Sequence, residues 1–401
     1  MIDRRRIGAA VVLVLGALTA AVLVYVRPWE PPGSETGSTA RTVSTSGSGS
    51  SALDSADWFL DHYEEPGGRV VRSDQGGDTV SEGEAYAMLL AVATGRQDRF
   101  DAAWSWSRSH LLMPDGLLAW RYEDGRVADP SSAADADLDT AWALSLAATR
   151  FSDGDYRRAA QRLAAGIVAH DEETVAGRPV LLPGPWAAAP APTIDPSYFA
   201  PLDMETLGSL DPGGNWAALA ASSRALLSEL LGANHLPSDW AIVVPDGTAH
   251  PTAPPGQSGA AVVYGFDAVR VPVRLAASCS PSDVALAASM WPDLQTRAQS
   301  DEDLVNLDLG GGSMPSSSGS PVGLVGAAAA AAAAGQRDEA ALLLDRAQFF
   351  NASSPTYYGS AWVALGRVLL ETNALGGCPP LRNQAVPAGS ALPGGGSGSG
   401  Q

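Results

Sequence analysis

The segment SSAADADLDTAWAL, residues 131–144, places three aspartates at alternate positions where an apolar helical pattern begins. Asp135 and Asp139 stand four residues apart, so they share one side of a helix, and Asp137 points elsewhere. The helix dipole favours acids in a first turn, which is a structural reason for Asp137 and Asp139. It explains three acids together less well, because buried charges must be compensated. The segment therefore predicts a buried helix that begins beside a polar site.

A calcium loop is the first alternative for these aspartates. Such a loop needs a glycine at its sixth position and a glutamate at its twelfth, where this chain has Thr140 and Leu146. No two of the five histidines have zinc-ligand spacing, and no glycine-rich phosphate loop is present. We therefore predict no metal ion and no cofactor.

Composition narrows the class of ligand. The chain has 401 residues, of which 45% are hydrophobic, and a formal net charge of −19. Phosphate binding needs basic patches, so this charge argues against nucleic acid as a partner. A neutral or cationic ligand remains compatible with it.

The first 26 residues have the pattern of a membrane anchor. Three arginines, Arg4 to Arg6, precede an uncharged apolar run over residues 7–26, which is long enough to span a bilayer as one helix. Because arginines stay on the cytoplasmic side, the rest of the chain is expected outside the cell. A cleaved signal peptide and a secreted protein are the alternative.

The remainder divides into a linker, one domain and a tail. Residues 27–51 are rich in Pro, Gly, Ser and Thr and predict a flexible linker; residues 383–401 predict a disordered tail. Strands are expected only at 69–72 and 241–244. Between the linker and the tail, apolar periodicity predicts helices at 52–62, 82–94, 98–110, 135–150, 155–170, 198–207, 214–231, 266–277, 281–295, 321–334, 337–350 and 357–372. We therefore predict one all-α domain over residues 52–382, built from paired layers of helices.

Two cysteines, Cys279 and Cys378, are the only ones in the chain. Outside the cytoplasm they could form a disulfide that closes a loop of about a hundred residues. Two buried thiols are the alternative.

A second acidic segment is TVSEGEAYAML, residues 79–89. Ser81 and Glu84 fit a capping box, which assigns Glu84 a structural task. Glu82 has no such task, and Gly83 leaves room beside its carboxylate. Glu82 is therefore the candidate for chemistry in this segment.

A third acidic segment is YGFDAVRVPVR, residues 264–274. Asp267 and Arg270 have the spacing of an ion pair on one helix face. Pro272 is unfavourable inside a helix, so an irregular helix start is expected there. Eleven tryptophans accompany these acids, and glycoside hydrolysis uses two carboxylates together with rings on which sugars stack.

These segments resemble glycoside hydrolase family 8, which includes bacterial endoglucanases and the endoglucanase that accompanies cellulose synthase. SEGEAYAMLLAVATGRQDRFDAAWSWSRSHLLMPDGLLAW, residues 81–120, resembles the first conserved block of that family, and residues 131–151 resemble its signature. DPSYFAP (195–201) and FDAVRVPVR (266–274) resemble two further blocks in the expected order. The resemblance covers about residues 52–375 and implies an (α/α)6 barrel of six inner and six outer helices. It also implies inverting hydrolysis of a β-1,4-glucan.

The resemblance assigns roles by motif. Glu82 would be the general acid, with burial and nearby acids keeping it protonated. Asp267 would be the general base, kept ionised by its neighbour Arg270, and Asp135 would hold the distorted sugar.

Substrate contacts follow from the same blocks. Trp120 and Tyr198 would contact sugar rings, as would Arg270, although core packing is the alternative for both aromatic residues.

The chain departs from the family pattern at five positions, none of which removes a proposed catalytic carboxylate. These departures concern the identity of the substrate. They are Ala134 in place of Ser or Thr, Thr140 in place of a larger apolar residue, Asp195 in place of Asn, Phe266 in place of Tyr, and Val273 in place of Trp.

Three functions are compatible with these observations. The first is a membrane-anchored endoglucanase with a β-glucan as substrate, associated with a cellulose synthase complex in the case of polymer synthesis. The second is a family member that acts on chitosan, xylan or mixed-linkage glucan. The third is a non-catalytic, glucan-binding component of a polymer-export complex.

Overall fold

The computed structural model describes residues 48–188, 190–257, 259–300, 302–309 and 320–382. The predicted anchor (1–26), nearly all of the predicted linker (27–51) and the predicted tail (383–401) lie outside these ranges. Within them, no helix combines the length and apolarity needed to cross a membrane.

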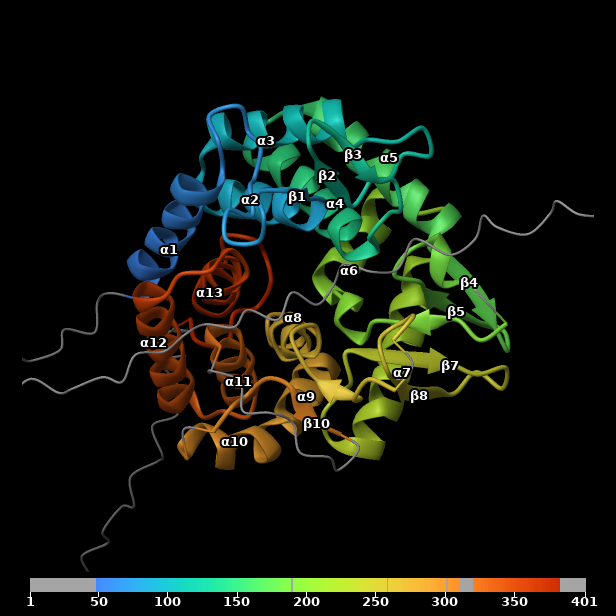
Figure 1. Ribbon diagram of the computed structural model, residues 1–401, viewed down its shortest axis with the longest axis vertical. Coiled ribbons are helices and arrows are strands. Elements are labelled where there is room, and N and C mark those ends of the chain that lie inside the picture. Colours follow the sequence, from blue (N-terminus) through green and yellow to red (C-terminus); the bar gives the residue numbers. More distant parts are fainter. Residues whose placement is uncertain (1–47, 189, 258, 301, 310–319, 383–401) are drawn as a thin grey trace, which may run out of the picture.

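Six helices form a closed ring at the centre of the described part of the chain (Figure 1). Each packs against the next, and the last packs against the first. Their sequences are largely buried, as an inner layer requires. They are α2 (Ser81–Thr94), α4 (Ala134–Arg150), α6 (Pro201–Leu210), α8 (Val271–Ala276), α11 (Pro321–Ala333) and α13 (Tyr357–Glu371).

A second layer of helices covers the outside of this ring. Each outer helix packs against the inner helix next to it in the sequence, with α9 and α10 sharing one position. This arrangement of paired layers is consistent with the predicted (α/α)6 barrel. The outer helices are α1 (Ser48–Tyr63), α3 (Gln97–His110), α5 (Gly154–His170), α7 (Trp216–Asn234), α9 (Pro281–Ser289), α10 (Trp291–Gln299) and α12 (Arg337–Ser353).

Inner helix α11 shows why small residues lie in this layer. Its sequence is PVGLVGAAAAAAA, and nearly all of it is buried. A Cβ on Gly326 would stand 2.6 Å from the backbone oxygen of Val269, and one on Gly366 of α13 would stand 2.3 Å from the Val325 side chain. These helices approach so closely only because the side chains between them are small.

In the described part of the chain, the connections between helices contain short antiparallel sheets. The sheet β1-β2-β3 lies next to the start of α2, and the sheet β6-β7-β8 lies next to α7. The pairs β4-β5 and β9-β10 complete the set. The bounds are β1 (Thr79–Val80), β2 (Arg121–Glu123), β3 (Arg126–Asp129), β4 (Glu172–Val175), β5 (Arg178–Leu181), β6 (Thr193–Ile194), β7 (Trp240–Val243), β8 (Ala249–Thr252), β9 (Val263–Tyr264) and β10 (Leu307–Asp308), with 3-10 turns η1 (Pro185–Ala187), η2 (Pro196–Tyr198) and η3 (Ala268–Arg270).

The predicted helices are all present, with three differences. The predicted helix 281–295 is two helices that meet at Met290, because a proline follows at the first turn of α10. The predicted helix 198–207 is the turn η2 followed by α6, and the predicted helix 266–277 is η3 followed by α8. Pro272 lies in the first turn of α8, which confirms the irregular start.

Of the two predicted strands, 241–244 corresponds to β7. The strand at 69–72 is wrong, because only a single bridge between Glu64 and Val70 forms there. The backbone of this segment forms hydrogen bonds with side chains instead of a neighbouring strand. The Val70 N–H donates to Glu84, and the Val70 carbonyl accepts from the Thr79 hydroxyl.

Cys279 and Cys378 are joined by a disulfide across a sequence separation of 99 residues. The bond ties the loop after α8 to the chain that follows α13, where the Cys378 N–H also donates to the Ala277 carbonyl at 2.9 Å. It therefore links the fourth inner helix of the ring to the last.

We expect the Cys279→Ser/Cys378→Ser double variant to lose about 4 kcal/mol of unfolding free energy, because the unfolded chain regains the freedom of a loop of this length. Urea unfolding measures the loss. A reductant should destabilise the native protein and leave the double variant unchanged. Equal stability of the two proteins without reductant would contradict the expectation.

Candidate active site

The guanidinium of Arg270 is the centre of the site. It is 2% exposed and belongs to η3, at the start of α8. Its Nη1 donates to Glu82 Oε1 at 2.7 Å and to Asp135 Oδ2 at 3.0 Å. Its Nη2 donates to Asp267 Oδ1 at 2.9 Å, and Asp195 Oδ2 lies 3.5 Å away. The three candidate acids and Asp195, which come from the four segments that resemble family blocks, therefore meet at one side chain.

Glu82 and Asp135 reach this point because two inner helices begin there. Each acid lies in the first turn of its helix, α2 or α4. The backbone of Trp120 links the two starts, since its carbonyl accepts from Ser81 N at 2.9 Å and its N–H donates to Ser131 O at 2.8 Å. This backbone role of Trp120 was not predicted.

One helical turn further on, Arg274 repeats the arrangement. Its Nη1 and Nη2 donate to the two carboxylate oxygens of Asp139 at 2.5 and 2.8 Å, and all these groups are buried. Asp135 and Asp139 therefore face the same continuous segment, η3 followed by α8, which confirms that they share one side of their helix. The two ion pairs join α4 to this segment at successive turns.

Asp137 points away from both rungs, as predicted. Its Oδ1 accepts the Leu118 N–H at 2.9 Å. Burial raises its pKa well above the usual range, and the nearby Asp171 raises it further. Asp137 therefore holds the chain before β2 and lies outside the site.

Negative charge exceeds positive charge around Arg270. Burial raises the pKa of Asp135 to about 7, assisted by Glu82 and opposed by Arg270. Burial also raises the pKa of Asp195 well above its usual range. One guanidinium cannot fully compensate four carboxylates, so the pKa values of Asp135 and Asp195 remain raised despite Arg270.

Arg270 lowers the pKa of Asp267, as predicted, but the net shift of the pKa is upward. Desolvation raises the pKa of Asp267, Arg270 lowers it, and Asp135 raises it, with a net upward shift. Arg270 must serve several acids at once, so its effect on any one of them is diluted.

The capping box predicted for Ser81 and Glu84 is also wrong. Helix α2 begins at Ser81 without a side-chain cap. Glu84 is fully buried and accepts the Val70 N–H at 2.7 Å and the Ser107 hydroxyl at 3.2 Å. It therefore fastens the loop before β1 to α3.

The loop that carries Asp267 is held by Asp239, which was not predicted. Asp239 Oδ1 accepts from Gly265 N and Ala268 N, each at 2.8 Å. A Cβ on Gly265 would stand 2.2 Å from Asp239 Oδ2, so a glycine is needed for this approach. The signal was present in the sequence only as an acid before a predicted strand.

Gly83 has a comparable role beside Glu82. A Cβ there would stand 2.2 Å from the hydroxyl of Tyr357. The glycine therefore makes space for the Tyr357 hydroxyl of α13, and the room expected beside the Glu82 carboxylate stays a prediction.

The predicted sugar-contacting aromatics lie around this centre. The Tyr198 ring lies 5.6 Å from the Arg270 guanidinium carbon and is partly exposed. Trp120 is partly exposed and packs against the core, and Phe266, next to Asp267, is 41% exposed. The sugar contacts of Trp120 and Tyr198 stay predictions.

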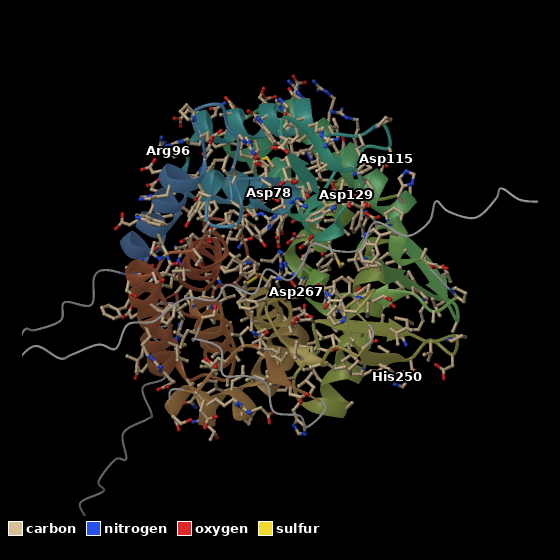
Figure 2. The ribbon with its side chains drawn as sticks, in the orientation of Figure 1. Asp78, Arg96, Asp115, Asp129, His250 and Asp267 are labelled. Carbon is tan, nitrogen blue, oxygen red and sulfur yellow. A yellow bond between two sulfur atoms is a disulfide. The ribbon has the colours of Figure 1, made fainter. Side chains whose placement is uncertain are left out.

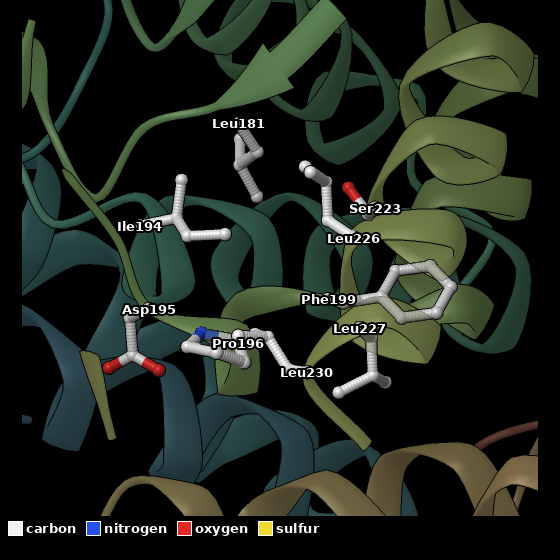
Figure 3. A pocket seen from close by; sticks show the side chains of 9 residues that line it. All are labelled: Leu181, Ile194, Asp195, Pro196, Phe199, Ser223, Leu226, Leu227 and Leu230. Atoms are coloured by element: carbon white, nitrogen blue, oxygen red, sulfur yellow. The ribbon is translucent and has the colours of Figure 1, made fainter. Parts of the chain in front are cut away.

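Figure 2 shows Asp267 near the middle of the ring, with Asp78 and Asp129 above it in that view. Asp78 accepts from Arg72 and from Arg121 and so ties the loop before β1 to β2. Figure 3 shows a small cavity of about 20 Å³ in which Asp195 is the one carboxylate, lined otherwise by apolar side chains and Ser223. Such a volume holds at most about one water molecule, so Asp195 has little solvent behind it.

The arrangement is suited to proton transfer at two separated points. The side chains of Glu82 and Asp267 are 23% and 34% exposed, whereas Asp135 is 5% exposed. Because Glu82 Oε1 and Asp267 Oδ1 bind one planar guanidinium, they lie at most about 8 Å apart. In the described ranges, no group of three or more His, Cys, Asp or Glu residues is placed to hold a metal ion.

Buried Asp171 allows a test of the electrostatics next to the site. It is 0% exposed, accepts from Ser132 Oγ at 3.3 Å, and burial raises its pKa to about 7. Its folded form therefore favours the proton, and its contribution to stability is full below about pH 4 and is lost as pH rises through about 7.

We therefore expect Asp171→Asn to become more stable than the native protein as pH rises from 4 to 8, by a difference on the order of 4 kcal/mol. Urea unfolding at both pH values measures it. Asp124→Asn, at an exposed turn, should give a difference that does not change with pH. A pH-independent effect of Asp171→Asn would contradict the expectation.

Comparison with known proteins connects this geometry to a family. Residues 40–369 match the model of glycosyl hydrolases family 8. An endoglucanase of Cellulomonas uda is 32% identical over 247 residues, which are 58% of this chain and 67% of that protein. A probable endoglucanase of Novacetimonas hansenii is 30% identical over 222 residues, or 54% and 64%. The match thus spans about two thirds of the length of these relatives.

Solved structures show the same fold over a longer range. An endoglucanase of Klebsiella pneumoniae, a family 8 glycosyl hydrolase, superimposes with a TM-score of 0.66 at 25% identity. The superposition covers 79% of this chain and 98% of that one.

Proposed function

Because the chain belongs to glycosyl hydrolases family 8, we propose that it is an endo-acting glycoside hydrolase that cleaves β-1,4-linked glucan with inversion. The observation that carries the proposal is the convergence of Glu82, Asp135 and Asp267 on Arg270. The endoglucanase names of the Cellulomonas uda and Klebsiella pneumoniae proteins support the substrate class.

In the proposed mechanism, Glu82 donates a proton to the glycosidic oxygen as the bond to the sugar breaks. Asp267 accepts a proton from a water molecule that attacks from the opposite face. Inverting enzymes place their two carboxyl groups roughly 6.5–9.5 Å apart to admit this water, and the upper limit of about 8 Å through Arg270 reaches the lower part of that range. Asp135, which accepts from the same Arg270 nitrogen as Glu82, would hold the distorted sugar.

The raised proton affinity of Asp267 bears on the working pH. A general base must be ionised to accept a proton, so activity should rise with pH as the Asp267 carboxyl group loses its proton. The proposal takes the two layers of helices as an (α/α)6 barrel with its substrate groove at this face.

We also propose that residues 7–26 anchor the protein and that the domain lies outside the cell. The length of the apolar run and the three preceding arginines support this. Protease added to intact cells should release the domain, and full protection would contradict the proposal. Association with a cellulose synthase complex stays a prediction.

The activity is tested on soluble cellulose derivative, mixed-linkage glucan, xylan and chitosan. We expect the first to be cleaved best, with viscosity falling faster than reducing ends appear, as internal cleavage requires. Proton NMR of the first product should show the α-anomer. A β-anomer would overturn inversion, and binding without turnover of any polymer would favour the glucan-binding alternative.

A further inference from the structure

A buried tyrosine forms a hydrogen bond with the side chain of the proposed general acid. The Tyr86 hydroxyl donates to Glu82 Oε1 at 2.5 Å. Both residues belong to α2, four residues apart, so they lie on one face of the helix. The Trp362 indole of α13 in turn donates from Nε1 to the Tyr86 oxygen at 3.1 Å.

The direction of these hydrogen bonds is determined by chemistry. An indole N–H can only donate, so the Tyr86 oxygen is the acceptor in its contact with Trp362. The hydroxyl proton of Tyr86 is then left for Glu82. Tyr86 is 0% exposed, and burial together with the charge of Glu82 raises its pKa well above the usual range. The tyrosine therefore stays neutral and remains a donor.

The two oxygens of Glu82 are consequently unequal. Oε1 receives Tyr86 from one side and Arg270 Nη1, at 2.7 Å, from another. Among the described residues, no group donates to Oε2. A proton carried on Oε1 would have to displace one of two buried donors, whereas Oε2 is free to carry one.

We propose that Tyr86, oriented by Trp362, is a positioning residue for Glu82. It holds Oε1 so that Oε2 presents the proton to the glycosidic oxygen, and it stabilises the carboxylate once that proton has left. The inference rests on the proposed role of Glu82 as general acid and adds the residues that aim it.

The test is the Tyr86→Phe variant, which keeps the buried ring and removes the hydroxyl. Loss of one charge-assisted hydrogen bond should lower kcat on cellulose derivative roughly tenfold to a hundredfold. A 2,4-dinitrophenyl β-cello-oligosaccharide should be hydrolysed at nearly the native rate, because its leaving group departs without a proton. The alkaline limb of the pH profile on polymer should move to higher pH, since the carboxylate has lost a donor that favours its ionised form.

Two variants accompany it. Trp362→Phe keeps the Tyr86 hydroxyl but removes the indole N–H that orients it. We therefore expect a smaller loss of kcat on polymer, again with little loss on the dinitrophenyl substrate. Tyr156→Phe removes the same kind of bond, from a tyrosine to Asp101, on outer helices α5 and α3, and should leave both substrates and the pH profile unchanged.

Equal losses on both substrates with an unmoved pH profile would overturn the proposal, as would native behaviour of Tyr86→Phe. If Tyr86→Phe does not fold, the same readouts on Trp362→Phe decide. Failure of the proposed function looks different: the native protein would cleave neither substrate, or Glu82→Gln would cleave the polymer at the native rate.

Discussion

Asp267→Asn should lower kcat on β-glucan by roughly 10²–10⁴-fold, the contribution expected of a general base. The amide has the shape of the carboxylate and still offers an oxygen to Arg270 Nη2. In the native protein this nitrogen lies 2.9 Å from Asp267 Oδ1. What it cannot do is accept a proton from the attacking water. The loss should therefore appear in kcat, with little change in KM or in thermal stability.

Azide should restore part of the activity of Asp267→Asn. It is a small nucleophile that needs no deprotonation, and the exposed side of Asp267 lets it approach the face that water would use. The C1–O bond would break as a C1–N bond forms, and a β-linked substrate would give an α-glycosyl azide. This product is measured by mass spectrometry and NMR.

The matched control for this variant is Asp246→Asn, at a surface turn where Asp246 accepts from Thr248. It should have native activity with or without azide. Native activity of Asp267→Asn itself, or a β-glycosyl azide, would contradict the role of Asp267 as the base of an inverting enzyme.

Glu82→Gln should lose a similar factor, roughly 10²–10⁴, on polymer and far less on the dinitrophenyl substrate. The amide oxygen can still accept from Tyr86 and Arg270, so the side chain keeps its place. It has no proton to give to a sugar leaving group. A good leaving group does not require one, and this selectivity separates a general acid from a residue needed for binding.

The decisive measurement is the ratio of kcat/KM on the two substrates, native against variant. Equal losses on both substrates would assign Glu82 a role other than proton donation.

Local patterns in the sequence were enough for the helices. Apolar spacing of 3.6 residues predicted the positions of the helices, although it joined α9 and α10 into one, and Pro272 marked the irregular start of α8. These signals act between residues a few positions apart. The short strands were mostly missed. They are two to four residues long and are stabilised by pairing with distant segments, which no local pattern reports.

The site divides in the same way. Motif spacing identified Glu82, Asp135 and Asp267, and the four-residue spacing of Asp135 and Asp139 correctly placed them on one face. The sequence left open whether Cys279 and Cys378 form a disulfide or remain buried thiols, and the structure shows the disulfide. The role of Glu84 was misread, since a capping box and a buried acceptor for Val70 N–H have the same local sequence.

By itself, the sequence determined the helix order, the irregular start of α8 and the acids that belong to the motifs. Only the tertiary structure decided that Arg270 serves four carboxylates, that the proton affinity of Asp267 rises, and that Trp362 directs Tyr86 across 276 positions of the chain. The reason is physical: helix periodicity is a property of neighbouring residues, whereas burial and charge compensation depend on which distant helices the closed ring brings together.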